Sequence, residues 1–333
     1  MNIENINIFI CNNCKSSDLK IVNNDEKSIE KSIYEGTIIC NICQHAIKIV
    51  EGVPRFVPES NYSDSFGYQW NKHYNTQLDS YTKLSISEDR LLSTTGWTAE
   101  DINQSTILEA GSGSGRFTEV LLKYGAKVIS FDYSKAIDVV KNNFQDQEHK
   151  LTVFQGDIMR IPLKKKSYSK VVCLGVLQHT KNPKDAFMHL SSLVAENGEL
   201  VIDIYKKTFF SILQWKYILR PITKRINTNL LYRIIKYMVP IMLPFVILLK
   251  KLFGRVGGRL SPICDYSDLG LSPSLNKAWS ILDTFDMYSP EYDKPQTRKA
   301  VLNWFSDAGF VEIEVKYGLN GIIAKGRLNG TKA

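Results

Sequence analysis

Residues 107–115 read ILEAGSGSG: an apolar run, then an acid, then glycine at every second position. The apolar run predicts a buried strand, and the pattern after Gly115 predicts a helix that begins directly behind the glycines. Glycine adopts the left-handed conformations of a tight turn and leaves the amide groups of that turn open to a ligand. The stretch therefore predicts a strand, a ligand-binding turn and a helix.

Four further apolar runs predict additional strands in the same domain. They cover residues 125–132, 152–157, 170–177 and 198–204, and helical patterns occupy 115–124, 134–144 and 183–195. Alternating apolar strands and helices are typical of an α/β fold with a parallel sheet and helices on both faces. Ligands bind such sheets past the carboxyl ends of the strands, which is where Glu109, Asp132 and Asp157 fall.

Two common nucleotide motifs do not fit the glycine turn. Arg116 stands where a dinucleotide fingerprint has a small residue, which counts against NAD or FAD, and the P-loop pattern does not occur. The E-x-G-x-G-x-G pattern, the strand-end Asp132 and the later Gly156-Asp157 instead resemble the class I S-adenosylmethionine-dependent methyltransferases. The resemblance covers residues 106–204 and 296–328, and it implies a Rossmann-like, mostly parallel sheet of seven strands with a terminal antiparallel hairpin.

The resemblance also implies which residues contact the cofactor, S-adenosylmethionine. Asp132 would accept hydrogen bonds from the ribose hydroxyls, and Asp157 or Ile158 would meet the adenine. Glu109 would face the methionine ammonium; the alternative is that Glu109 and Asp132 only cap helices. Arg90 is a candidate for the methionine carboxylate, with a surface arginine as the alternative. The remaining predicted cofactor-binding residues are Gly111, Ser112, Gly113, Gly115, Tyr133 and Leu174.

Length and composition indicate more than one domain. The chain has 333 residues, 44% of them hydrophobic, which predicts a sizeable core and two or three domains. The N-terminus lacks the basic start and apolar run of a secretory signal, so we expect a cytoplasmic protein. The predicted parts are a zinc-ribbon-like domain (1–58), a helical cap (59–105), a methyltransferase core (106–204 and 296–330), and a basic, apolar helical insertion with a substrate loop (205–295).

Four cysteines near the N-terminus predict a structural zinc site. Cys11 and Cys14 form one C-x-x-C pair, and Cys40 and Cys43 form another, so together they supply a closed tetrahedral set of thiolates. His45 is a candidate to replace one of these cysteines as a ligand, although the four cysteines already complete the set. The segment that follows resembles the small zinc ribbons attached to, or partnering, some methyltransferases. Such a ribbon either faces the substrate or only stabilises the catalytic domain as a structural staple, and we favour the stabilising role.

The basic character of the chain is local. The whole chain carries a net charge of +8, whereas residues 205–259 contain twelve Lys or Arg and no Asp or Glu. Within them, Tyr237–Leu249 forms an apolar run of 13 residues, short of the roughly 20 that span a bilayer, and Pro240 and Pro244 are expected to interrupt its helix. The alternatives are a helical hairpin packed on the core, a lid over a phosphorylated or sugar-nucleotide acceptor, and contact with an anionic membrane surface.

A proline-punctuated segment, residues 282–297, predicts an irregular loop near the catalytic face. It resembles Ser-Pro-x-Tyr-Asp-x-Pro-Gln-Thr loops in bacterial methyltransferases of glycan and natural-product gene clusters. The resemblance makes Tyr288, Tyr292 and Asp293 candidates for acceptor binding, and Tyr292 and Asp293 also candidate catalytic residues. The alternative is a loop held by its own tyrosine hydroxyl and carboxylate contacts. His179, after the fourth strand, is the first candidate for a general base because histidine titrates near neutral pH. Alternatively, His179 only shapes the cofactor pocket. A helix at 297–308 and strands at 311–317 and 320–327 complete the fold.

The sequence as a whole therefore predicts an S-adenosylmethionine-dependent methyltransferase (EC 2.1.1 class) that acts on a small polar acceptor. O-methylation of a sugar or of a glycan or natural-product precursor is the leading hypothesis, with a cytoplasmic location that includes the inner face of the membrane. The alternative is an rRNA or tRNA base methyltransferase whose ribbon recognises RNA. Nucleic acid ranks lower because the cations cluster in the apolar insertion and not in the ribbon. The sequence makes no prediction of oligomeric state.

Overall fold

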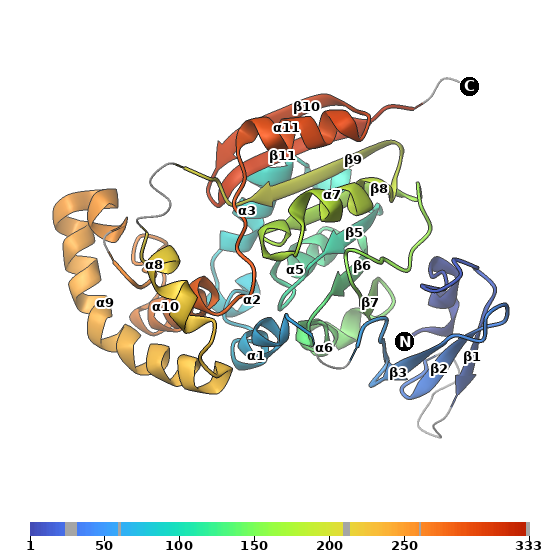
Figure 1. Ribbon diagram of the computed structural model, residues 1–333, viewed down its shortest axis with the longest axis horizontal. Helices are drawn as coiled ribbons and strands as arrows, with labels where there is room; N and C mark the ends of the chain where they lie inside the picture. Colours follow the sequence, from blue (N-terminus) through green and yellow to red (C-terminus); the bar gives the residue numbers. More distant parts are fainter. Residues whose placement is uncertain (24–31, 59–60, 209–213, 260, 331–333) are drawn as a thin grey trace.

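The computed structural model describes residues 1–23, 32–58, 61–208, 214–259 and 261–330. A central sheet flanked by helices forms its middle (Figure 1). A small N-terminal sheet lies at one end of the molecule, and a long curved helix lies at the opposite end (Figure 1). The α/β domain therefore lies between two added segments, the N-terminal sheet and the long helix.

The central sheet has seven strands in the order β10-β11-β9-β8-β5-β6-β7. Strands β5 to β9 run parallel to one another, while β11 is antiparallel to both β9 and β10. This confirms the predicted seven-stranded, mostly parallel sheet with a terminal hairpin. The strands are β5 (Thr106–Ala110), β6 (Lys127–Asp132), β7 (Leu151–Gln155), β8 (Tyr168–Leu174), β9 (Val194–Ile204), β10 (Phe310–Gly318) and β11 (Gly321–Leu328).

Helices cover both faces of this sheet because its strands are apolar on both sides. Neighbouring strand residues point to opposite faces, so Ile107 belongs to one apolar cluster and Leu108 to the other. The predicted helix 183–195 ends earlier, because β9 already begins at Val194. The flanking helices are α5 (Arg116–Lys123), α6 (Ala136–Asn143), α7 (Pro183–Ser191) and α11 (Arg298–Asp307), with short 3₁₀ turns at Gln145–Gln147 and Leu177–His179.

In the described part of the chain, four helices precede the first strand of the central sheet. They are α1 (Asp64–Lys72), α2 (Asp79–Thr82), α3 (Ile86–Thr95) and α4 (Ala99–Ile102). The third packs on α5 through the fully buried Leu91, and the fourth begins with a reciprocal capping box between Thr98 and Asp101. The segment before the central sheet is therefore largely helical.

The N-terminal segment forms a four-stranded antiparallel sheet that docks on β7. Its elements are a 3₁₀ turn (Ile3–Ile8), β1 (Leu19–Asn23), β2 (Gly36–Cys40), β3 (Ala46–Val50) and β4 (Val53–Pro54). Arg55 forms a parallel bridge to Gln155, and the rings of Phe9 and Phe56 lie 5.3 and 5.8 Å from that of Phe154. The small sheet and the main domain therefore share one apolar cluster.

The insertion after β9 consists of three helices: α8 (Trp215–Thr223), α9 (Thr228–Arg259) and α10 (Pro273–Tyr288). They share a third apolar cluster of their own, which includes Leu231, Val239 and Phe285. The prediction that residues 282–297 form a loop is wrong for Leu282–Tyr288, which belong to α10. That segment is helical because Leu282 and Phe285 are completely buried on one face of the helix.

Pro240 and Pro244 do not interrupt α9, contrary to the prediction from the sequence. Each proline removes one backbone donor, but both are exposed, so water can satisfy the freed carbonyl groups. The helix curves around α8 and α10 (Figure 1) and departs from helical geometry at Gly254. By length and composition alone, Thr228–Gly254 could cross a membrane. The apolar part of the helix therefore extends beyond the 13-residue run identified in the sequence.

Candidate functional site

A cavity of about 800 Å³ opens at the carboxyl ends of β5, β6 and β8. Helices of the cap and of the insertion complete its walls, so residues far apart in the chain face one space. Ten of the predicted site residues line it: Arg90, Gly111, Ser112, Gly113, Asp132, Tyr133, Asp157, Ile158, Leu174 and His179. The predicted residues Glu109, Gly115, Tyr292 and Asp293 are not part of the lining.

The glycine turn has the backbone conformation expected from its sequence. Gly111, Gly113 and Gly115 have φ angles of 77°, 56° and 90°, in the left-handed region that disfavours other residues. A Cβ atom on Gly111 would lie 2.3 Å from Val176 Cγ2, and one on Gly113 would lie 3.0 Å from Trp70 Cε2. The turn is thus tight against both neighbours, and only glycine fits at these positions.

Glu109 lies at the end of β5 and is almost completely buried. Its Oε2 accepts hydrogen bonds from Thr118 Oγ1 (2.5 Å) and Ser130 Oγ (3.2 Å), whereas Oε1 has no partner among the described residues. Burial raises the pKa of Glu109 to about 7. In the free protein the carboxyl group therefore holds a proton more tightly than in the unfolded chain, and its contribution to stability is lost as the pH rises from 4.5 towards 7.

Two further acids stand at the ends of the next strands. Asp132 Oδ2 accepts a hydrogen bond from the amide of Gly113 (3.1 Å), while Oδ1 accepts from the amide and the hydroxyl of Ser134. Burial raises the pKa of Asp132, and these hydrogen bonds oppose the shift. Asp157 Oδ1 accepts from the amide of Met159 (2.8 Å). Both carboxylates are fixed in the cavity wall by local backbone contacts.

Arg90 reaches the cavity from α3 and is held by Asp203 at the end of β9. The Nη2 atom of Arg90 lies 2.8 Å from Asp203 Oδ2, and Asp203 Oδ1 also accepts from the amide of Gly175 and from Asn320. The neighbouring Asp203 raises the pKa of Arg90 despite burial. This ion pair excludes the alternative of an arginine on the solvent-exposed surface.

The site fits the cofactor that the sequence implies. Several buried polar atoms around the glycine turn lack hydrogen-bond partners within the described part of the chain, among them Glu109 Oε1, Ser112 Oγ, Ser114 Oγ and Arg90 Nε. Unpartnered buried polar atoms are costly, and they usually mark a place where water or a ligand binds. Together with Asp132, they supply acceptors and donors for the polar groups of a nucleoside and an amino acid.

His179 lines the cavity from the 3₁₀ turn after β8 and is mostly buried. Its Nδ1 lies 2.9 Å from the backbone oxygen of Tyr292. A carbonyl oxygen can only accept, so Nδ1 carries the hydrogen, and in the neutral ring the lone pair is on Nε2. The rings of Phe66 and Tyr205 pack edge-on at 5.3 and 5.5 Å and hold the imidazole in place.

The two predicted catalytic residues of the segment after α10 have other partners. Asp293 is almost completely buried in an ion pair with Lys216 (2.8 Å) and accepts from the hydroxyl of Tyr217 (3.1 Å). Tyr292 contributes its carbonyl to His179 and packs its ring 5.1 Å from that of Tyr62. Both residues therefore position cavity residues without lining the cavity themselves.

The insertion side of the cavity contains acids with few partners. Asp283 accepts from Gln77 (3.2 Å) and from the hydroxyl of Tyr266, and burial raises its pKa to about 6. Asp286 accepts only a long contact of 3.5 Å from Gln69 within the described ranges. Burial raises the pKa of Asp286, although the nearby His179 opposes the shift.

The cations of the insertion that reach the cavity are neutralised. Lys216 is paired with Asp293, and Lys250 lies 3.2 Å from Asp265 and 2.6 Å from Asp268. This arrangement does not support the hypothesis that the insertion presents cations to a phosphorylated acceptor. The cavity wall on this side instead offers carboxylates and aromatic rings.

Several residues that shape the cavity were not among the predicted site residues: Trp70, Lys216, Asp283 and Asp286. Trp70 belongs to an aromatic run before the first strand, which is a signal that the sequence contains. The other three lie on α8 and α10, where no motif marks them. Their role depends on the packing of the insertion against the sheet.

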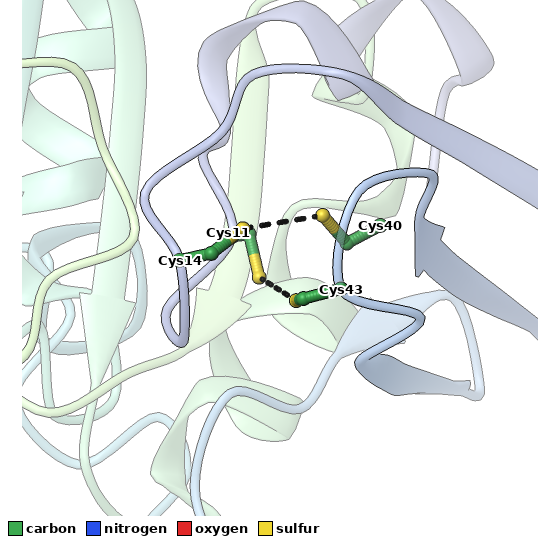
Figure 2. Close-up of side chains that lie close together, drawn as sticks. All are labelled: Cys11, Cys14, Cys40 and Cys43. Atoms are coloured by element: carbon green, nitrogen blue, oxygen red, sulfur yellow. Dashed lines mark hydrogen bonds between the residues drawn. The ribbon is translucent and has the colours of Figure 1, made fainter.

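The four cysteines form a separate candidate metal centre (Figure 2). Their sulfur atoms all lie within 4.8 Å of one another, and the Cys11–Cys43 and Cys14–Cys40 pairs are 3.5 Å apart. Tetrahedral zinc with thiolates at about 2.3 Å requires sulfur atoms about 3.8 Å apart, so the geometry fits. No described residue of the segment 1–58 lines the cavity, so the cysteine centre is separate from it.

Comparison with known proteins gives a consistent result. Residues 108–202 match a family model described as a methyltransferase domain. A ubiquinone biosynthesis O-methyltransferase of Coxiella burnetii is 27% identical over 108 residues, which cover 32% of this chain and 46% of that protein. The mitochondrial enzyme of that name from Schizosaccharomyces pombe is 30% identical over 111 residues, or 32% of this chain and 40% of that protein. This chain thus matches about half the length of these relatives or less.

A solved structure with a similar fold is the magnesium protoporphyrin IX methyltransferase of Synechocystis with bound SAH. It aligns with a TM-score of 0.44 at 16% identity and covers 80% of this chain and 97% of that chain.

We expect the purified protein to contain one zinc ion per chain. Cys14→Ser should lose most of the metal and lower the melting temperature by several degrees, because the small sheet shares its apolar cluster with the main domain. Elemental analysis and thermal denaturation measure both effects. His45→Ala is the control and should retain zinc, since four sulfur atoms complete the site. Full zinc content in Cys14→Ser would contradict the assignment.

Affinity for S-adenosylhomocysteine should rise about tenfold between pH 5.5 and 7, because Glu109 must lose its proton to pair with the ammonium group of the ligand. The pKa of about 7 places this change in an accessible range. Calorimetric titration at several pH values measures it. Glu109→Gln should bind weakly with a flat pH profile, whereas the exposed control Glu148→Gln should behave like the parent protein. A pH dependence that persists in Glu109→Gln would exclude this role.

Proposed function

From the premise that the chain carries a class I, S-adenosylmethionine-dependent methyltransferase domain, we propose that it methylates a hydroxyl group of a small polar acceptor, with a sugar as the leading candidate. The observation that carries this proposal is a single cavity in which the glycine turn and the free Nε2 of His179 face the same space. The names of the two relatives described above, both ubiquinone biosynthesis O-methyltransferases, support transfer to oxygen.

The proposed cofactor contacts follow the cavity wall. Asp132 takes the ribose hydroxyls, Asp157 and Ile158 take the adenine, and Arg90 takes the methionine carboxylate. Glu109, which does not itself line the cavity, faces the methionine ammonium directly or through water. The turn from Gly111 to Gly115, which includes Ser112, lets the cofactor lie close to the backbone. Tyr133 and Leu174 complete the pocket. When bound, S-adenosylmethionine supplies a methyl group that its sulfonium already activates.

His179 is the proposed general base. Its Nε2 accepts the proton of the acceptor hydroxyl as that oxygen becomes methylated, while the Tyr292 carbonyl holds the Nδ1 hydrogen. Asp286 then stabilises the resulting imidazolium, since each group lowers the energy of the other's charged form. Tyr292 and Asp293 act by positioning His179 and Lys216.

The charges on the insertion side support a neutral, hydroxyl-rich acceptor. Carboxylates accept hydrogen bonds from hydroxyl groups, and Asp283 and Asp286 line the cavity together with Tyr205, Tyr266 and Trp279. Aromatic rings and acids around a polar cavity suit a sugar better than a phosphate, because Lys216 and Lys250 are already paired. A glycan or natural-product precursor with such a sugar fits the same wall.

The proposed division of the chain assigns one role to each part. Residues 1–58 act as a zinc-dependent staple on the edge of the sheet, 59–105 as a cap over the cofactor, and 205–295 as the acceptor wall, around the core of 106–204 and 296–330. The distance of the ribbon from the cavity weakens the alternative in which it presents RNA to the site. None of the six cysteines, all of which are described, forms a disulfide bond, as expected for the proposed cytoplasmic location.

The proposed function predicts which acceptors receive label from methyl-labelled S-adenosylmethionine. Free sugars, nucleotide sugars and lipid-linked glycans, tested as a panel beside tRNA, rRNA and a phenolic compound, should give labelled O-methyl sugars and unlabelled RNA. Mass spectrometry of the products identifies the methylated atom. Labelled RNA bases would replace the proposal with the base methyltransferase.

His179→Ala should lower kcat by about 10² to 10⁴, the usual contribution of a general base, and leave affinity for S-adenosylhomocysteine within a few-fold. The measurement combines turnover of the identified acceptor with calorimetric titration of the ligand. His189→Ala, on the partly exposed side of α7, is the matched control and should keep full activity. Near-normal turnover in His179→Ala would remove this residue from the mechanism.

A further inference from the structure

One face of α9 is apolar and exposed along almost the whole helix. Its residues recur every three or four positions: Leu230, Ile234, Tyr237, Ile241, Phe245, Leu248 and Leu252. At 100° per residue these positions fall within a narrow arc, and they extend for about 33 Å along the helix axis. We call this set the α9 stripe. It is separate from the cavity, which none of these residues lines.

The stripe is most exposed at its centre. Tyr237, Ile241 and Phe245 are 72%, 70% and 66% exposed. Figure 1 shows α9 curving along the edge of the molecule, on the far side of α8 and α10 from the central sheet. Contiguous exposed apolar surface of this length marks a site of contact with another apolar phase or molecule.

Charge indicates which partner covers the stripe. The exposed side chains of Arg233, Lys236 and Lys251 lie along α9 beside it, and residues 205–259 contain no acid. An apolar face bordered by cations alone is complementary to a bilayer surface with anionic headgroups. A second copy of this chain is disfavoured, because a symmetric contact would bring two sets of like charges together.

The opposite face of α9 excludes a spanning orientation. Leu231, Ile235, Val239, Leu243 and Val246 are buried in the insertion's own apolar cluster. Only 28% of the most apolar 18-residue window of this helix is buried, yet the buried face is continuous and packs on α10. If α9 spanned a bilayer, it would either lose this packing or bring α10, with its carboxylates, into the hydrocarbon. The helix is therefore suited to lie in the plane of the interface.

We infer that α9 docks the protein on an anionic membrane surface, with the α9 stripe in the headgroup region and its flanking cations on lipid phosphates. This inference is independent of the reaction proposed above, since it concerns a different surface. It places the catalytic cavity beside a bilayer and thereby adds lipid-linked molecules to the acceptors within reach.

Vesicle co-sedimentation of the full chain tests this surface. The protein should pellet with phosphatidylcholine vesicles that contain 30 mol% phosphatidylglycerol and much less with pure phosphatidylcholine. Ile241→Glu/Phe245→Glu should reduce the bound fraction at least tenfold. The matched control Leu302→Glu/Val311→Glu, which changes exposed apolar residues outside the insertion, should bind like the parent protein.

A second pair of variants separates local charge from net charge. Arg233→Glu/Lys251→Glu should weaken binding to the anionic vesicles, whereas Lys164→Glu/Lys165→Glu has the same net charge and should not. Calorimetric titration with S-adenosylhomocysteine verifies that every variant is folded.

Three results would overturn the inference: equal binding of the stripe variant and its control, binding that resists alkaline carbonate extraction as a spanning helix does, or a dimer of the parent protein that only the stripe variant dissociates in the absence of vesicles.

Discussion

The site depends on a steric constraint at one turn. The backbone after β5 folds back with three glycines in left-handed conformations, and the side chains of Val176 and Trp70 close on it from two sides. Any side chain at these glycines would displace its neighbours or strain the backbone. The strand-end carboxylates of Glu109 and Asp132 lie next to this turn, and Asp132 accepts a hydrogen bond from the amide of Gly113. The turn can pack this closely against its neighbours because these three positions carry no side chain.

Aromatic packing ties the zinc-ribbon-like sheet to the methyltransferase core. Phe9 and Phe56 contact Phe154, which itself stacks on Phe131 at 5.0 Å in the neighbouring strand. The contact covers the end of the sheet at β7, where an edge strand would otherwise expose unpaired backbone groups. We therefore propose that the four cysteines, when they hold zinc, stabilise the catalytic domain through the order they impose on this small sheet.

The insertion separates its charges between two surfaces. Its acids, such as Asp283 and Asp286 on α10, lie in the cavity wall, while unpaired cations such as Arg233 lie on the outer side of α9. Lys216 and Lys250 face inward, and each meets a carboxylate there. The insertion thus lines the cavity with acids and aromatic rings, and it turns an apolar, basic face to the outside.

The sequence by itself determined the order of strands and helices, the glycine turn, the acids at the strand ends and the cysteine pairs. These features are local, because each depends on residues a few positions apart. Only the tertiary structure decided that Asp293 neutralises Lys216, 77 residues away, and that Asp203 holds Arg90 across 113 residues. It also decided that α9 continues through Pro240 and Pro244 and that Leu282–Tyr288 is helical. Such outcomes depend on which surfaces become buried against distant elements, and no local pattern encodes that choice.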